Sequence, residues 1–217
     1  MPLSAELAPL ADAVADAVRT ASRAGRAPVV LIDGPSGAGK SSLADLLLAD
    51  WPADGSPRLV RMDDLYPGWD GLDAGSDAVG RDLLAPLRAT GSGSWQRWDW
   101  ASERPAGRIH VTGTQPLVVE GCGTLSRRNA ALADLAVWLR ADDALRKRRA
   151  LARDGETFAV QWDRWQAEFD RYVAREDPVA SAAIVLDVTA LDLTPAGRRR
   201  TRGGDLTEPV SGTTVET

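Results

Sequence analysis

The sequence is poor in cysteine and histidine, with only Cys122 and His110 among 217 residues. One cysteine excludes an internal disulfide, and one residue of each kind cannot build the usual zinc site of cysteine and histidine ligands. We therefore expect a reduced, cytoplasmic protein that has no zinc centre.

Long apolar runs are also missing. The sequence contains no run of about 18 apolar residues, and Glu6, Asp12 and Asp16 stand where an export signal would carry basic residues. We expect neither a membrane span nor secretion. The formal net charge of −5 and the pI near 5.0 argue against a nucleic-acid-binding surface and favour small anionic ligands as partners.

The length and the 44% hydrophobic content suit a single α/β domain over residues 1–195, followed by a polar tail, 196–217, that we expect to be disordered. Short apolar runs typical of buried strands alternate with helical patterns, which predicts a parallel sheet between two helical layers. The expected strands are 28–33, 58–62, 116–121, 135–139 and 183–187, and the expected helices are 4–23, 42–49, 77–88, 142–153 and 156–174. We expect loops at 68–76 and 91–94 and an ordered patch at 95–100.

The most informative stretch is GPSGAGKSS, residues 34–42. It fits the pattern G-x-x-x-x-G-K-[ST] and lies between an expected strand and an expected helix, which is the context that a phosphate-binding P-loop requires. Glycines there permit positive φ angles and leave backbone N–H groups open to phosphate oxygens. The alternative is a glycine- and serine-rich turn beside a lysine. We expect a nucleoside triphosphate to be bound by Gly34, Ser36, Gly37, Ala38, Gly39, Lys40, Ser41 and Ser42.

Within this loop, Lys40 would reach the β- and γ-phosphates, and Ser41 would offer its hydroxyl to Mg²⁺. Two acids, Asp63 and Glu120, follow expected strands and should reach the same sheet edge as the loop. Phosphoryl transfer needs such acids, for the metal ion and for the attacking group. The alternatives are that Asp63 belongs to a turn or helix cap and that Glu120 caps a turn.

The order of motifs resembles the uridine kinase and phosphoribulokinase branch of the P-loop kinases, and uridine kinase most closely, over residues 29–188. After the P-loop come Asp63-Asp64-Leu65-Tyr66, Trp98-Asp99-Trp100, Val118-Val119-Glu120-Gly121 and a basic segment from Leu145 to Asp154. The resemblance implies a P-loop NTPase fold with a five-stranded sheet and a short helical lid at about 142–157.

The resemblance also implies roles for individual residues. ATP would be the phosphate donor, and Asp63 would be the general base. Mg²⁺ would be surrounded by Ser41, Asp63 and Glu120. Arg149 and Arg153 would close over the phosphates, and the basic run could equally be a solvated helix face. The acceptor would meet Tyr66, Trp98, Asp99 and Glu103.

The acceptor segment departs from that family. A histidine that contacts the pyrimidine is absent, and Glu103 stands at the nearest position. Tryptophans replace the tyrosine and phenylalanine, so an aromatic wall is one interpretation and core packing the other for Trp69, Trp95, Trp98 and Trp100. We expect Trp162 and Trp165, three residues apart, to pack in the core.

Together these patterns favour an ATP-dependent kinase that phosphorylates a hydroxyl of a small, nucleoside-like metabolite. A nucleotide-binding regulatory protein with little transfer activity is the main alternative, and a hydrolysing ATPase or GTPase is a third. Cys122 and His110 have no expected role in this chemistry. The patterns leave the acceptor, the choice of ATP or GTP and the oligomeric state open.

Overall fold

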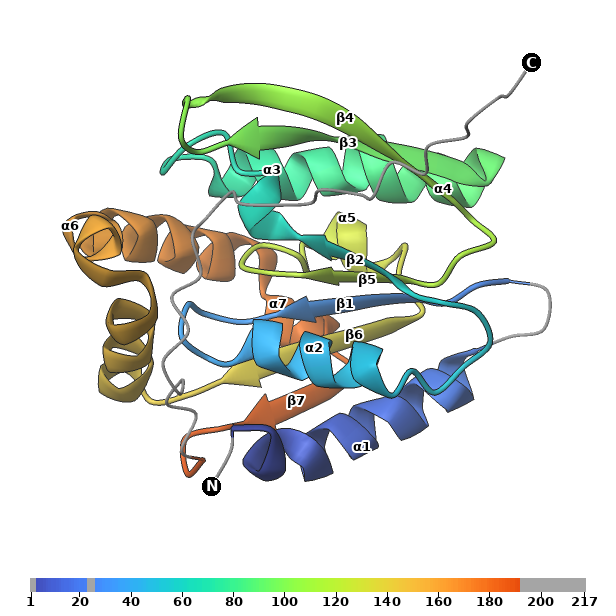
Figure 1. The fold of residues 1–217 in the computed structure, drawn as a ribbon, viewed down its shortest axis with the longest axis horizontal. Helices are drawn as coiled ribbons and strands as arrows, with labels where there is room; N and C mark the ends of the chain where they lie inside the picture. Colours follow the sequence, from blue (N-terminus) through green and yellow to red (C-terminus); the bar gives the residue numbers. More distant parts are fainter. Residues whose placement is uncertain (1–2, 23–25, 192–217) are drawn as a thin grey trace, which may run out of the picture.

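A five-stranded parallel sheet organises the computed structural model, which describes residues 3–22 and 26–191 (Figure 1). The order across the sheet is β2-β5-β1-β6-β7, and each neighbouring pair is parallel. The strands are β1 (Val29–Asp33), β2 (Arg58–Arg61), β5 (Leu117–Glu120), β6 (Leu135–Arg140) and β7 (Ile184–Asp187). All five expected strands are confirmed, whereas the expected tail at 196–217 lies outside the described residues.

Two hydrophobic cores form because successive side chains of a strand point to opposite faces of the sheet. Val30 and Ile32 of β1 belong to one core, together with helices α1 (Leu3–Ala21) and α2 (Lys40–Ala49). Val29 and Leu31 belong to the other core. The other helices are α3 (Leu72–Ala78), α4 (Ala85–Thr90), α5 (Arg127–Ala130), α6 (Asp143–Glu176) and α7 (Pro178–Ser181). The second core includes residues of α3, α4 and α6, which confirms the three-layer α/β/α prediction.

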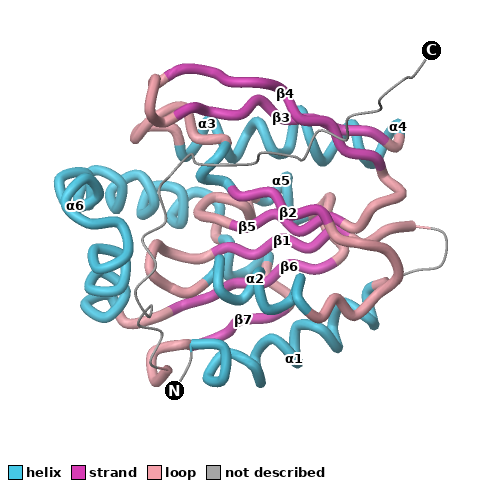
Figure 2. The backbone as a smooth tube through the Cα atoms, viewed as in Figure 1, coloured by secondary structure: helices cyan, strands magenta, loops and turns pink. Residues whose placement is uncertain are grey.

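Helix α6 consists of two arms that meet at Gly155. This glycine has φ 70° and ψ −156°, a conformation open almost only to glycine, and it interrupts the helix. The arms, residues 143–154 and 156–176, point in different directions (Figure 2). They correspond to the two helices expected at 142–153 and 156–174.

The expected loop at 68–76 is partly wrong, because helical structure begins at Leu72 and continues to Thr90 through a π-helical segment, Val79–Leu84. The glycines there serve close packing. A Cβ on Gly75 would lie 2.8 Å from Tyr66 Cδ1, and a Cβ on Gly80 would lie 2.3 Å from Asn129 Oδ1. Composition suggested a loop, whereas tertiary contact selects a helix.

An antiparallel hairpin was not expected. Strands β3 (Ser92–Asp99) and β4 (Arg104–Thr112) form a separate two-stranded sheet that packs beside the π-helical segment Val79–Leu84 and α4 (Figure 1). The expected loop at 91–94 is therefore wrong from Ser92 onward, because residues 92–94 belong to β3. A Cβ on Gly93 would lie 2.3 Å from Leu83 O, so the segment is closely packed. The buried apolar side chains that the hairpin adds to the core are Trp95 and Val111. With so few of them, the alternation of apolar and polar residues is too weak to predict two strands from the sequence.

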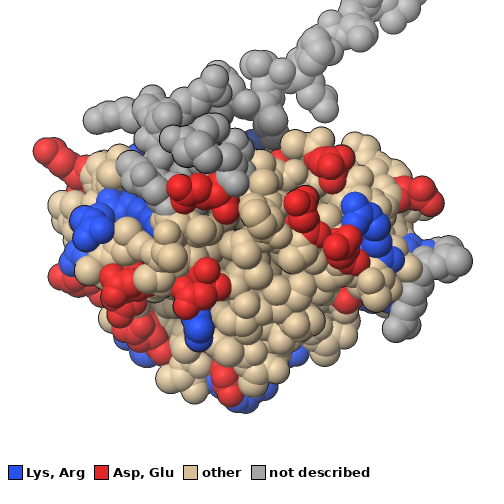
Figure 3. Space-filling view, turned by 90° about the horizontal axis from the view of Figure 1, so that it is seen from below, with Lys and Arg blue, Asp and Glu red and all other residues tan. Residues whose placement is uncertain are grey.

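The surface carries mixed charges. On the face seen in Figure 3, acidic and basic side chains are interspersed, with no broad area of one sign among the residues drawn in colour. Among residues 3–22 and 26–191, no helix combines the length and apolar character that crossing a bilayer requires.

Candidate active site

Asp33, the last residue of β1, anchors the start of the P-loop. Its fully buried carboxylate accepts hydrogen bonds from Gly34 N (2.6 Å), Gly123 N (3.1 Å), Leu125 N (2.8 Å) and Tyr172 Oη (2.7 Å). Burial raises the pKa of Asp33, although these hydrogen bonds act in the opposite direction. One carboxylate therefore joins the loop to the segment after β5 and to the second arm of α6.

The P-loop has the backbone geometry that phosphate binding needs. Gly34, Gly37 and Gly39 have φ angles of 142°, 82° and 88°, so the predicted positive φ angles are confirmed. Helix α2 begins directly after Gly39, which points its N-terminal N–H groups toward the loop. A Cβ on Gly37 would lie 2.0 Å from Arg146 O, so the loop also lies tightly against the first arm of α6.

The side chain of Lys40 lies across this loop. Its Nζ donates to Gly34 O (2.7 Å) and Pro35 O (3.0 Å) and lies 3.5 Å from Cys122 Sγ. Lys40 and Cys122 are both buried. The ammonium group is therefore held inside the loop 34–42, beside a thiol that the sequence patterns did not connect with this site.

One pocket brings half of the predicted site residues together. Its lining residues are Ser36, Gly37, Gly39, Lys40, Ser41, Asp63, Glu120, Gly121, Cys122 and Arg153. They come from the segments that follow β1 and β2, from the last residue of β5 and the segment after it, and from the first arm of α6. The juxtaposition arises because parallel strands deliver their carboxyl ends to one edge of the sheet.

Glu120 is paired with an arginine that sequence reasoning missed. Arg61 stands opposite Glu120 in the register of β2 and β5, and its Nη1 donates to Glu120 Oε1 (2.6 Å). Its Nη2 donates to Asp45 Oδ1 (2.5 Å). Burial alone would lower the pKa of Arg61, but the two carboxylates outweigh burial and raise it. The pairing depends on β2 and β5 being neighbours, which the sequence patterns did not specify.

Asp63 lies in a 3₁₀ turn, Met62–Asp64, directly after β2. The turn interpretation is therefore correct for its backbone, and its side chain also lines the pocket. The indole Nε1 of Trp100 donates to the main-chain oxygen of Asp63 (2.7 Å). Burial raises the pKa of the neighbouring Asp64, and Arg97 acts in the opposite direction.

The two arginines predicted to contact phosphates, Arg149 and Arg153, lie in different surroundings. Arg153 lines the pocket and donates from Nε (2.8 Å) and Nη2 (2.7 Å) to the carboxylate of Asp154. Arg149 instead directs its guanidinium to the main-chain oxygens of Val188 and Leu191. In this structure Arg149 therefore contacts the main chain near the end of β7 and does not line the pocket, and its contact with phosphates stays a prediction.

The predicted acceptor residues are not gathered in the pocket. Tyr66 is fully buried, and its hydroxyl donates to Cys122 O (2.6 Å), so it supports the pocket wall from behind. Asp99 accepts hydrogen bonds from Ala101 N (3.0 Å) and Ser102 Oγ (2.5 Å). Glu103 is exposed, with φ 50°. Asp99, the last residue of β3, and Glu103 thus lie at the tip of the hairpin.

Four aromatic rings pack on one another beside the pocket, and we call Trp69, Trp100, Phe158 and Trp165 the aromatic cluster. Trp69 has its ring centroid 5.0 Å from Trp100, 5.6 Å from Phe158 and 6.5 Å from Trp165. Trp165 Nε1 also donates to Ser36 Oγ (3.1 Å) in the P-loop. These contacts favour ring packing over an open aromatic wall.

Other tryptophans differ in how far they support core packing over an aromatic wall. Trp95 is buried in the core and Trp98 is half-buried on β3. Trp162 and Trp165 are buried, which confirms the prediction that both pack in the core. The tryptophan-rich segment is therefore mainly a packing device, with Trp98 left as the predicted acceptor contact.

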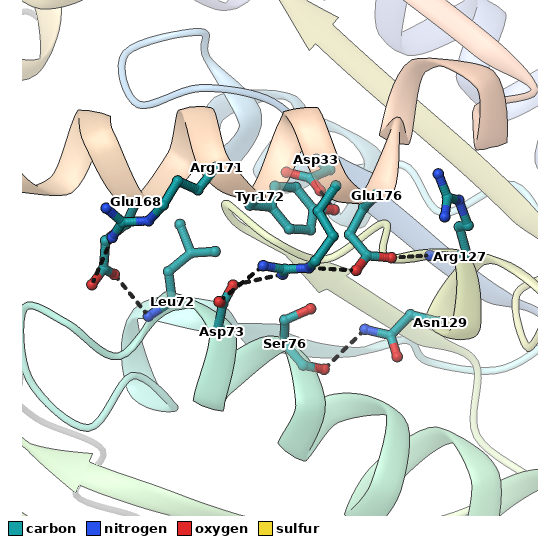
Figure 4. Close-up of polar contacts among 11 residues, drawn as sticks. Asp33, Leu72, Asp73, Ser76, Arg127, Asn129, Glu168, Arg171, Tyr172 and Glu176 are labelled. Atoms are coloured by element: carbon teal, nitrogen blue, oxygen red, sulfur yellow. Dashed lines mark hydrogen bonds and ion pairs between the residues drawn. The ribbon is translucent and has the colours of Figure 1, made fainter.

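The second arm of α6 is tied to α3 and α5 (Figure 4). Arg175 donates to both oxygens of Asp73 (2.8 and 3.1 Å), and Glu176 accepts from Arg127 N (3.1 Å). The same arm supplies Tyr172 to Asp33. It is therefore a fixed support for the P-loop, while the first arm carries Arg153 over the pocket.

The pocket offers oxygen groups rather than a complete metal cage. Across residues 3–22 and 26–191, no three His, Cys, Asp or Glu side chains are grouped to hold a metal ion. Ser41, Asp63 and Glu120 share the pocket, so their association with Mg²⁺ stays a prediction. Such a set fits a cation that keeps waters and takes further oxygens from bound phosphates.

No protein-family model and no curated protein sequence matches the chain. Solved structures do. A possible uridine kinase from Bacillus stearothermophilus is 20% identical, with a TM-score of 0.61 over 84% of this chain and 100% of the other. A candidate fructose transport system kinase from Silicibacter sp. TM1040 is 16% identical, with a TM-score of 0.51 over 85% of this chain and 98% of the other. At these identities the likeness shows a shared fold.

Proposed function

We propose that this chain is an ATP-dependent phosphotransferase that phosphorylates a hydroxyl of a small metabolite, nucleoside-like by resemblance. The observation that carries the proposal is the single pocket that joins Lys40 and Ser41 of the P-loop to Asp63 and Arg153. A donor site for phosphates, an acid and a cationic side chain are the parts that phosphoryl transfer requires. The likeness in fold to two proteins described as small-molecule kinases agrees with it.

In this mechanism the P-loop N–H groups and Lys40 hold the β- and γ-phosphates, and Arg153 neutralises charge on the group in transfer. The Asp63 carboxylate orients the acceptor hydroxyl and accepts its proton as the oxygen attacks phosphorus and the bond to the β-phosphate oxygen breaks. Ser41 and Glu120 would hold Mg²⁺, which lowers the charge on the phosphates. Arg61 keeps the Glu120 carboxylate in place.

An acceptor screen tests the proposal. ADP release would be followed with ATP, Mg²⁺ and panels of nucleosides, sugars and pantothenate-like alcohols, for the wild type and the Lys40→Ala variant. We expect at least one alcohol to stimulate ADP release and to be recovered as its phosphate ester, only with the wild type. Phosphate release that is independent of every alcohol would instead indicate a hydrolase.

A regulatory nucleotide-binding protein is the second candidate, because two predicted contributors to transfer are engaged elsewhere. Arg149 bonds to main-chain oxygens, and Asp99 bonds within the hairpin turn. Tight ATP binding in calorimetry, with no stimulated turnover across the alcohol panel, would favour this function over the kinase.

A further inference from the structure

The tip of the hairpin reaches the predicted base. Trp100 immediately follows the last residue of β3, and its Nε1 donates to the main-chain oxygen of Asp63 (2.7 Å). Asp63 itself lies in the short turn Met62–Asp64. Two segments that are 37 residues apart in the chain are therefore joined at the residue to which the mechanism assigns proton transfer.

Packing holds the Trp100 indole in this orientation. Its ring centroid lies 5.0 Å from that of Trp69, which in turn stacks on Phe158 at 5.6 Å. Phe158 is three residues beyond Gly155, where the two arms of α6 meet. A phenylalanine at position 100 would keep most of the ring contact but has no N–H to donate. The ring and the hydrogen bond can therefore be tested separately.

We propose that Trp100 is a positioning residue, which holds Asp63 in place for the acceptor hydroxyl through its indole N–H. This inference rests on the proposed kinase function. The reason is geometric: a general base must lie within hydrogen-bond reach of the proton that it accepts, and a displacement of about 1 Å can cost about 10²-fold in rate. Trp100 itself stays outside the transfer step.

The chain offers a matched control in the same hairpin. Trp95 is buried in the core, and its Nε1 has no hydrogen-bond partner among residues 3–22 and 26–191. Trp95→Phe therefore makes the same chemical change as Trp100→Phe, in a more buried place, without removing a hydrogen bond. A general loss of stability should affect Trp95→Phe at least as strongly.

Steady-state kinetics with the acceptor from the screen give the first readout. We expect Trp100→Phe to lower kcat about 10- to 100-fold, with the KM for ATP within about twofold of wild type. Trp95→Phe should keep kcat within about twofold. Equal kcat values for the two variants would overturn the proposal.

Hydrogen exchange gives a second readout that does not depend on turnover. The amides of Leu65 and Tyr66 donate to Met62 O at 2.8 and 3.2 Å, so exchange reports on the turn that holds Asp63. Exchange in residues 62–66 should be faster in Trp100→Phe than in Trp95→Phe, and equal exchange would refute the positioning role. An inactive wild type would refute the kinase function instead, and the exchange comparison would still decide the role of Trp100.

Discussion

The two sides of the pocket are built in different ways. The phosphate side is one continuous stretch, residues 34–42, whose conformation follows from its glycines and from the start of α2. The proposed acceptor side combines Asp63, in the turn after β2, with Arg153 of α6, and the hairpin reaches it only through the contact of Trp100 with Asp63 O. A continuous motif can be identified from the sequence, whereas a surface formed by distant segments can be identified only from the structure.

The two sides of the pocket also differ in how closely they define a ligand. The phosphate side has features that any bound triphosphate would need, namely backbone N–H groups, a lysine and a hydroxyl. On the acceptor side, Tyr66 is buried and Asp99 is bonded within a turn, so neither defines a substrate shape. The structure therefore supports the proposed donor site with more features than the proposed acceptor site.

Lys40→Ala should have the largest effect and would break the account of the phosphate side. We expect turnover to fall at least about 10³-fold while the fold is retained, because the side chain bonds only to the loop and Cys122 in the described contacts. The assay is ADP release, with circular dichroism to check folding. Lys147→Ala, in the first arm of α6 and paired with Asp163, is the matched control. Comparable loss in both variants would contradict the assignment.

Arg153→Ala and Arg149→Ala together test how the first arm of α6 contributes. We expect Arg153→Ala to lower kcat about 10²-fold, because this arginine lines the pocket. Arg149→Ala should chiefly lower the free energy of unfolding, since Arg149 bonds to the main chain near the end of β7. Steady-state kinetics and urea unfolding distinguish the two, and a larger fall in kcat for Arg149→Ala would restore the interpretation from sequence.

A smaller effect should separate two glycines with positive φ. Gly37→Ala combines backbone strain with a contact at 2.0 Å to Arg146 O, whereas Gly155→Ala has strain but no atom within 4 Å of the new Cβ. Strain alone costs about 1–3 kcal/mol, so Gly37→Ala should lose more stability in urea unfolding and bind ATP more weakly. Equal losses in stability and unchanged ATP affinity would show that the close contact is unimportant.

Much of the fold could be predicted, because buried parallel strands are short apolar runs that are visible without partners. Residues 116–121 and 135–139 are examples, and both became strands. The hairpin could not be predicted, since Gly93 packs against Leu83 O and few of its side chains enter the core. Tertiary contact decided that region, as it did for the helix that begins at Leu72.

The parts of the candidate site that could be predicted are those that belong to a local sequence pattern. A pocket is shared by Lys40, Ser41, Asp63 and Glu120 because each lies at or after the carboxyl end of a strand, and these ends meet at one edge of the sheet. The pairing of Arg61 with Glu120 was not predicted, because the sequence does not show that β2 and β5 are neighbours in the sheet. The contact of Arg149 with Leu191 O was not predicted, because a basic helical run does not show which neighbour each side chain meets. Side-chain partners, rather than backbone elements, are what the patterns left undetermined.

Transfer of labelled γ-phosphate from ATP to the screened acceptor tests the central claim most directly, with wild type compared with Asp63→Asn. The account predicts a labelled ester with wild type, a rate about 10²- to 10⁴-fold lower with Asp63→Asn, and similar ATP affinity. Asp64→Asn, which changes the adjacent acid, serves as the matched control. A wild-type rate with Asp63→Asn, or label recovered only as inorganic phosphate, would contradict the account.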